Sequence, residues 1–140
     1  MRYFPALALA ASLCAGASGP ALAQHDPAYD VKGGIVDQAT YNGYRRYTES
    51  CLRCHGPDGA GSSYAPDLTN SLKTLSYDQF AETIINGRKN VTVASTNVMP
   101  AFGTVEDVAL YLDDIYGYLK ARSDAKLGRG RPRRAGEDQN

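Results

Sequence analysis

The chain has 140 residues, three of them cysteines, and its 15 basic and 15 acidic side chains cancel to no net charge. This length supports one small domain, and so few cysteines exclude a fold held together by many disulfides. The charges are unevenly spread, because residues 24–119 hold seven Lys or Arg against twelve acids, whereas residues 120–140 hold seven against three. We therefore expect an acidic globule with a basic C-terminal tail.

Residues 1–23 are typical of an export signal. Arg2 supplies a positive start, residues 5–17 are mostly Ala and Leu, and Ala21-Leu22-Ala23 is a small-x-small cleavage site. A transmembrane anchor is the alternative, but Gly, Ser and Pro interrupt the apolar run before it is long enough to span a bilayer. We predict cleavage after about Ala23, a periplasmic location and no transmembrane anchor.

Residues 24–36 include Pro27 and a Gly-Gly pair, and we expect them to form a flexible leader. The globular domain is predicted to cover residues 37–122. Its first helix should run from Gln38 to Ser50, because Asp37 is well placed to cap the N-terminus.

A second helix is predicted after Ser76, which can form a capping box with Gln79, and it should end at Asn86-Gly87. A last helix is predicted to begin at Thr104. Its apolar residues recur at spacings of three and four, so one face should be buried. These residues are Val105, Val108, Leu112, Ile115 and Leu119. The pattern indicates an all-α fold of three main helices and long loops, with almost no strand.

After Arg122 the chain loses its apolar character, and residues 123–140 are predicted to be a disordered basic tail. Such a tail could suit nucleic acid in isolation. An exported protein meets no chromosomal DNA, however, so no nucleic-acid partner is expected. Two interpretations of the tail stay open: a solvated charged end, or a docking arm for an acidic partner that weakens with salt.

The main chemical motif is Cys51-Leu52-Arg53-Cys54-His55, directly after the first helix. Two cysteines at this spacing can each bond one vinyl group of the same haem, and the next histidine can then ligate the iron. A structural zinc site would need four ligands, but the other histidine, His25, lies in the leader. A thioredoxin-like pair would need a βαβ setting, and a plain disulfide would leave His55 unexplained. The motif therefore favours covalent haem.

The second axial position of the iron has three candidates: Met99, His25 or no protein ligand. Signal cleavage removes Cys14 and Met1, so Met99 becomes the only methionine of the mature chain. It lies just before Pro100, in a segment without helical periodicity between two predicted helices. A lone methionine is usually core filler. This position nevertheless favours Met99 as the ligand, and a thioether ligand would raise the reduction potential.

Over residues 37–122 the chain resembles the class I c-type cytochromes. Gly43 and Tyr47 stand eight and four residues before the first cysteine, as a Gly and an aromatic do in that family. The resemblance implies the class I cytochrome c fold, wrapped around one covalently bound haem c. It also implies that Gly43 lets the last helix cross closely, near Ile115 and Tyr118.

Two further segments carry the same resemblance. Ala65-Pro66-Asp67-Leu68 resembles the segment whose proline carbonyl accepts a hydrogen bond from the proximal histidine, and Met99-Pro100-Ala101-Phe102-Gly103 resembles the methionine-ligand loop. The resemblance thus implies covalent attachment at Cys51 and Cys54 and axial ligation by His55 and Met99. The implied haem contacts are Gly56, Pro66, Leu68 and Phe102.

Tyrosine-rich segments at 41–47, 64–66, 71–77 and 111–122 carry a narrower resemblance, to small periplasmic cytochromes of the cytochrome c-L type. It implies a monomeric electron carrier, not an enzyme, that accepts electrons from a PQQ-dependent methanol or other alcohol dehydrogenase. Another cytochrome or a terminal oxidase would be the acceptor. The alternatives are a general shuttle between respiratory complexes and a terminal oxidase, and a haem sensor or peroxidase with a labile Met99.

Overall fold

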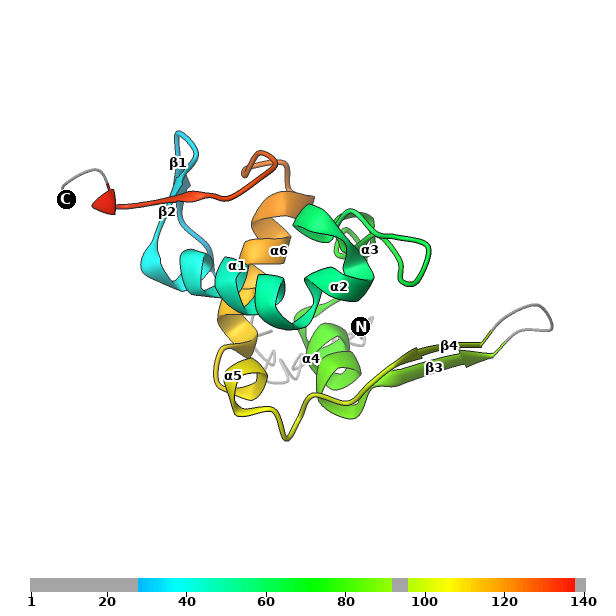
Figure 1. Cartoon of the computed structure of the whole chain (residues 1–140). Coiled ribbons are helices and arrows are strands. Elements are labelled where there is room, and N and C mark those ends of the chain that lie inside the picture. The colour runs from blue at the N-terminus through cyan, green and yellow to red at the C-terminus, as the bar shows by residue number, and fades with distance from the viewer. Residues whose placement is uncertain (1–27, 92–95, 138–140) are drawn as a thin grey trace, which may run out of the picture.

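The computed structural model describes residues 28–91 and 96–137, so the expected export signal lies outside the described residues. Three helices form the body: α1 (Gln38–Ser50), α4 (Tyr77–Asn86) and α6 (Leu112–Ser123). Figure 1 shows them packed together, with an extended hairpin on one side and the C-terminal segment on the other. The shorter helices are α2 (Leu52–His55), a 3-10 turn η1 (Pro57–Gly59), α3 (Leu68–Ser71) and α5 (Glu106–Ala109). The strands are β1 (Val31–Lys32), β2 (Ile35–Val36), β3 (Arg88–Val91), β4 (Thr96–Met99) and β5 (Arg133–Arg134).

Two of the three predicted helix starts are confirmed. The Asp37 carboxylate accepts a hydrogen bond from the backbone N–H of Thr40 at 2.8 Å and caps α1. Ser76 and Gln79 form the reciprocal capping box at the start of α4, which ends at Gly87 as expected. Each cap satisfies backbone donors that the first helical turn leaves without partners.

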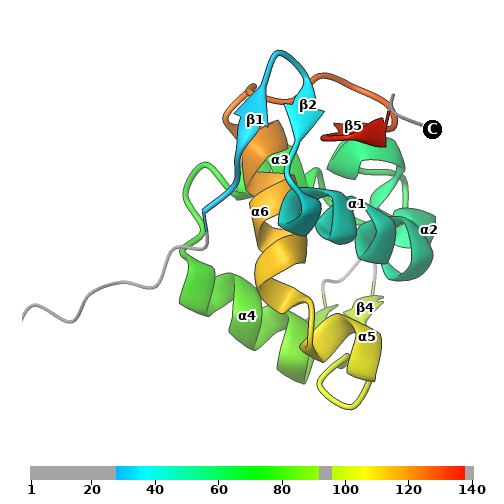
Figure 2. The ribbon, with the colours of Figure 1, turned by 90° about the vertical axis from the view of Figure 1, so that its left-hand side faces the viewer.

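Helix α1 crosses α6 (Figure 2), and Gly43 lies where the two helices come closest. A Cβ atom on Gly43 would lie 1.8 Å from the carbonyl oxygen of Asp114 and 2.9 Å from the Cβ of Tyr118. Only a residue without a side chain allows two helix backbones to approach so closely. The expected close crossing is therefore confirmed, with Tyr118 as one contact and the Asp114 backbone as the other.

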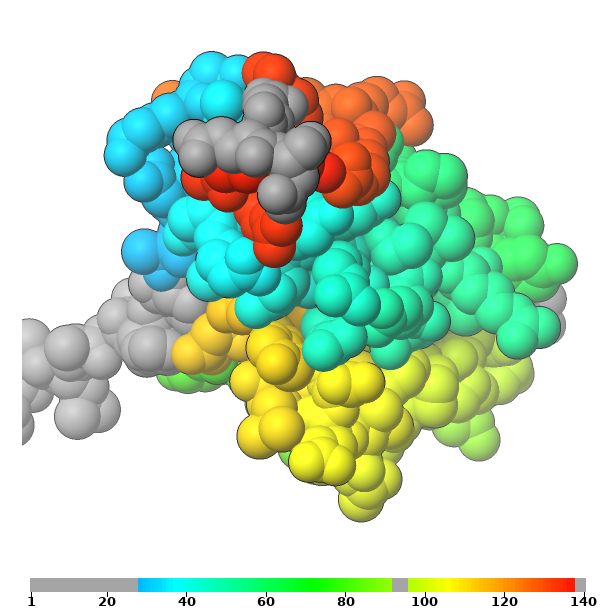
Figure 3. Space-filling view, turned by 60° about the vertical axis from the view of Figure 1, so that its left-hand side comes forward, coloured from blue at the N-terminus to red at the C-terminus, as the bar shows by residue number. Residues whose placement is uncertain are grey.

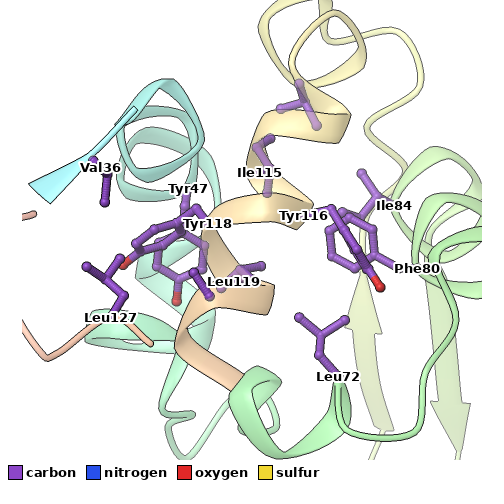
Figure 4. Close-up of a cluster of buried hydrophobic side chains, with 12 residues drawn as sticks. Val36, Tyr47, Leu72, Phe80, Ile84, Ile115, Tyr116, Tyr118, Leu119 and Leu127 are labelled. Atoms are coloured by element: carbon purple, nitrogen blue, oxygen red, sulfur yellow. The ribbon is translucent and has the colours of Figure 1, made fainter. Parts of the chain in front are cut away.

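Helix α6 is buried on more than the single face that its periodicity predicts (Figure 4). On one side, the ring of Tyr118 packs 5.6 Å from that of Tyr47. On the other, the ring of Tyr116 packs 5.1 Å from that of Phe80 on α4. The periodicity identifies Ile115 correctly but misses both tyrosines, because the helix is enclosed by other elements instead of lying on a surface.

The last helical region begins later than expected and is interrupted. Helix α5 starts at Glu106 instead of Thr104, and Tyr111 leaves helical geometry before α6 begins. Arg46 of α1 contacts both sides of this break, with its guanidinium 3.3 Å from the Asp107 carboxylate and 4.5 Å from the centre of the Tyr111 ring. The bend thus brings α5 and the start of α6 against α1.

Short parts of the expected flexible leader (residues 31–36) and of the expected disordered tail (residues 133–134) instead pair in one small sheet. Strand β1 pairs antiparallel with β2, and β5 pairs parallel with β2. Figure 3 shows the C-terminal segment lying against the N-terminal strands and α1. The guanidinium groups of Arg131 and Arg134 each lie 5.5 Å from the centre of the Tyr41 ring. The tail is held by polar and cation–π contacts, which an apolar pattern does not reveal.

The segment before Met99 also gains structure. Strands β3 and β4 form an antiparallel hairpin in which Arg88 lies opposite Met99. Among residues 28–91 and 96–137, no helix is long and apolar enough to cross a membrane.

Candidate haem-binding site

The cysteine–histidine motif forms the turn that follows α1. The backbone N–H of Cys51 bonds to the Tyr47 carbonyl at 2.8 Å, and that of His55 bonds to the Cys51 carbonyl at 2.9 Å. Because residues four apart lie on the same side of a helical turn, Cys51 and His55 share one face. Cys51 is half-buried, Cys54 is exposed and His55 is buried. Both thiols are free.

The imidazole of His55 is oriented by the carbonyl of Pro66. Its Nδ1 lies 3.0 Å from the Pro66 oxygen, so the expected hydrogen bond is present. A carbonyl only accepts hydrogen bonds, and Nδ1 must therefore carry the proton. This leaves Nε2 with its lone pair available to ligate a metal, and the bond to Pro66 makes that nitrogen a better donor.

The loop between His55 and Pro66 is tied back onto the motif. The phenol of Tyr47 donates a hydrogen bond to the Gly56 carbonyl, and the Gly61 N–H donates to the His55 carbonyl at 2.8 Å. Downstream, the carboxylate of Asp67 caps α3 and so places Leu68, which is half-buried against the core. Gly56 and Pro66 thus lie in this loop, which Tyr47 holds at Gly56, and Leu68 begins the helix that follows.

Met99 and Phe102 approach from the other side of the fold, at the C-terminus of α4. The Phe102 N–H donates to the Ile84 carbonyl at 2.9 Å. A Cβ atom on Gly87 would lie only 2.7 Å from the Met99 carbonyl oxygen, so the methionine segment rests directly on the backbone that ends α4. Both Met99 and Phe102 are half-buried and pack against the core.

Burial gives the groups around the motif unusual acid–base properties. Removal from solvent raises the pKa of the Cys51 thiol to about 11, and the neighbouring Cys54 adds to this effect. Burial likewise raises the pKa of the Tyr47 phenol, which keeps its proton for the bond to Gly56. A redox-exchange cysteine needs a lowered pKa. Cys51 itself therefore lacks the lowered pKa of a redox-exchange nucleophile.

Sequence reasoning missed an ion pair beneath the motif loop. The Arg122 guanidinium lies 2.8 Å from the Asp58 carboxylate, and the two side chains are only 3% and 12% exposed. Asp58 also accepts from the Gly130 N–H at 3.0 Å and from Arg129 at 3.3 Å. The loop that follows His55 is thereby fastened to the end of α6 and to the tail. Arg122 lies in the last turn of α6, where basic residues are usually exposed, so the sequence did not indicate that its side chain is buried.

These donors fit a covalently bound haem. The set combines two free thiols, a buried imidazole of defined tautomer and a half-buried thioether, which together are the attachment and axial groups of a c-type haem. Leu68 and Phe102 add half-buried apolar surface on the two sides of the fold.

Comparisons with known proteins identify c-type cytochromes as relatives of this chain. Residues 38–119 match the family model described as cytochrome C oxidase, cbb3-type, subunit III. The chain is 50% identical to cytochrome c-553I of Paracoccus denitrificans over 111 residues, which are 79% of this chain and 49% of that protein. It is 47% identical to cytochrome c-555 of Methylococcus capsulatus (Bath) over 96 residues, 68% of this chain and 72% of that protein. The chain therefore spans about half the length of the first relative and most of the second.

A solved structure is similar as well. It is that of the c-type cytochrome XoxG from Methylobacterium extorquens AM1, with a TM-score of 0.70 and 43% sequence identity. The match covers 79% of this chain and 68% of the XoxG chain. The helical fold expected from the sequence is thus found in a protein of similar sequence.

Proposed function

Because this chain belongs to the class I c-type cytochromes, a family whose members bind haem c covalently, we propose that it is a periplasmic one-electron carrier. When bound, haem c supplies an iron that takes up and gives back one electron. Cys51 and Cys54 would hold it through thioether bonds, and His55 and Met99 would occupy the two axial positions. The observation that carries this proposal is the bond from His55 Nδ1 to the Pro66 carbonyl, which leaves Nε2 free to ligate.

The chain's own groups then determine what the site can do. His55 is locked in one tautomer and one orientation, so it does not need to rearrange when the iron changes charge. The soft thioether of Met99 favours the ferrous state and raises the potential. With both axial positions filled, no position is left for a substrate or a gas. This arrangement suits electron transfer rather than catalysis or sensing.

We further propose that a PQQ-dependent methanol or other alcohol dehydrogenase is the electron donor. The support is the set of tyrosine-rich segments that resemble the cytochrome c-L type, together with the similarity to XoxG and cytochrome c-555. Oxidising one alcohol to an aldehyde releases two electrons and two protons. Two copies of the oxidised cytochrome would each accept one electron, and the protons would pass to solvent. Another cytochrome or a terminal oxidase would reoxidise the monomeric carrier.

Stopped-flow mixing of the oxidised holoprotein with a PQQ-dependent methanol dehydrogenase and methanol tests the donor. We expect the haem to be reduced in a second-order reaction that requires methanol. Ascorbate serves as the control, because a small reductant needs no docking surface. Reduction by ascorbate but not by the dehydrogenase with methanol would reject this donor and leave the carrier function in place.

A further inference from the structure

The β3–β4 hairpin extends away from the helical body (Figure 1). It follows α4 directly, and its last residue is Met99, the proposed axial ligand. Every described residue of the hairpin is exposed except Met99, which is half-buried. The hairpin is therefore an exposed structure whose base lies at the proposed iron site.

The strand register gives this hairpin two different faces. Directly paired residues lie on the same face of an antiparallel ladder, and residues two apart along a strand do so too. The pairs Lys89–Val98 and Val91–Thr96 consequently share one face, which we call the valine face. Val91 and Val98 on it are 66% and 64% exposed. Arg88, Asn90, Asn97 and Met99 form the other face, where the Arg88 Nε donates to the Asn90 side chain at 3.2 Å.

The base of the hairpin is also positively charged. Arg88 and Lys89 are adjacent and exposed, and neither forms an ion pair with any acid in the described parts of the chain. They lie within a region, residues 24–119, that has five more acids than bases (twelve against seven). An acidic partner would be repelled by most of this region and attracted to the hairpin.

We propose that the hairpin is the docking surface for the protein that donates electrons, through the valine face with its Lys89 and through Arg88 at the base of the opposite face, and that the donor presents acidic side chains around a small apolar patch. The proposal rests on the proposed function. Val98 on the valine face directly precedes Met99 in the chain, so docking here places the donor close to the proposed iron ligand, and electron-transfer rates fall steeply with distance. Two valines and Lys89, with Arg88 at the edge, make a small surface, which suits a brief encounter with rapid release.

A second copy of this chain is a poorer occupant of the same face. Two-fold pairing brings the same surface patch of both copies together. The described residues of the valine face include Lys89 but no acid, so each patch would bring a positive charge to the other without a carboxylate to pair with it, which is unfavourable. An acidic donor meets no such repulsion.

The test measures the second-order rate of reduction of the holoprotein by methanol dehydrogenase and methanol, at low and high salt. The variants are Val91→Ser with Val98→Ser, and Lys89→Glu. The matched controls are Leu110→Ser, at a residue that is 71% exposed, and Lys32→Glu on β1, on the other side of the molecule in Figure 1. Absorption spectra and ascorbate reduction of every variant report whether Met99 ligation is intact.

We expect both hairpin variants to slow reduction by the dehydrogenase about tenfold, because they remove apolar contact and electrostatic steering respectively. Lys89→Glu should also flatten the salt dependence. Both controls should react at the wild-type rate, and ascorbate should reduce all proteins equally.

If wild-type protein is reduced and the hairpin variants react equally fast, the docking proposal is wrong although the donor is right. If the wild type is not reduced, the donor itself is wrong and the docking proposal falls with it. Concentration-dependent dimers that disappear in the valine variant would show instead that this face binds a second copy.

Discussion

The two basic segments of this molecule use their charges in opposite ways. Three exposed cations of the tail have partners in the same chain: Arg129 contacts Asp58, Arg131 contacts Glu137 and Arg134 bonds to Gln38. The cations at the base of the β3–β4 hairpin have no acidic partner among the described residues. A charge that is already paired cannot also attract a partner strongly. The tail therefore serves the fold, and the hairpin is the part left available for docking.

The largest effect is expected where the hairpin meets the proposed iron site. Met99→Ala removes the thioether and opens one axial position, so the low-spin spectrum of the holoprotein should be lost and the reduced protein should bind carbon monoxide. Leu110→Ala is the control, since that exposed side chain lies outside the site. An unchanged spectrum in Met99→Ala would mean that the hairpin does not carry the iron ligand. The base of the hairpin would then not lie at the iron site.

The structural role of the tail and α6 is tested at Asp58. Asp58→Ala leaves the buried guanidinium of Arg122 without its carboxylate, which should lower the free energy of unfolding by about 3 kcal/mol. Denaturant titration of the holoprotein measures this loss. Asp30→Ala removes an exposed pair with Lys32 and should cost less than about 1 kcal/mol. Equal effects of the two substitutions would show that the ion pair beneath the loop is not structurally important.

Removal of the tail separates the two basic segments directly. A chain ending at Leu127 keeps the Arg122–Asp58 pair but loses β5 and the hydrogen bonds from Arg129 and Gly130, so stability should fall by about 2 kcal/mol. Reduction by methanol dehydrogenase should nevertheless keep the wild-type rate and salt dependence. If truncation slows that reaction and weakens its salt dependence, the tail is a docking arm for the donor and does not serve the fold alone.

The smallest effect is a pH response confined to the tail. The backbone N–H of Arg134, and then the side chain of Arg131, hold the pKa of Glu137 below its ordinary value of 4.5. A lowered pKa in the folded state means that the contribution is complete above about pH 4.5 and is lost as pH falls through the folded value. The protection of the β5 amides against hydrogen exchange, relative to the intrinsic exchange rate at each pH, should therefore fall on acidification. Glu137→Gln should remove this response, and its persistence in that variant would assign it to another group.

Short-range features were predicted well because they depend on residues close in sequence. The caps at Asp37 and Ser76 are formed with backbone N–H groups three residues ahead, and spacing alone locates them. The family resemblance located the bond from His55 to Pro66 and the close approach at Gly43. Neither contact could be derived from composition. The His55–Pro66 bond depends on the path of a loop, and the approach at Gly43 depends on how two helices cross.

By itself the sequence determined the Cys51–His55 motif, Met99 as the only methionine after Met1, and the capped helices α1 and α4, because each is a local pattern with few alternatives. Only the tertiary structure decided which charges are used inside the molecule. Arg122 and Asp58 are 64 residues apart, and Arg131 and Tyr41 are 90 apart. Contacts at such separations form only after the chain has folded, so the tail resembled a free arm in the sequence and the hairpin gave no signal. The physical reason is that the sequence gives the charge of each side chain, whereas the fold determines which opposite charge lies near it.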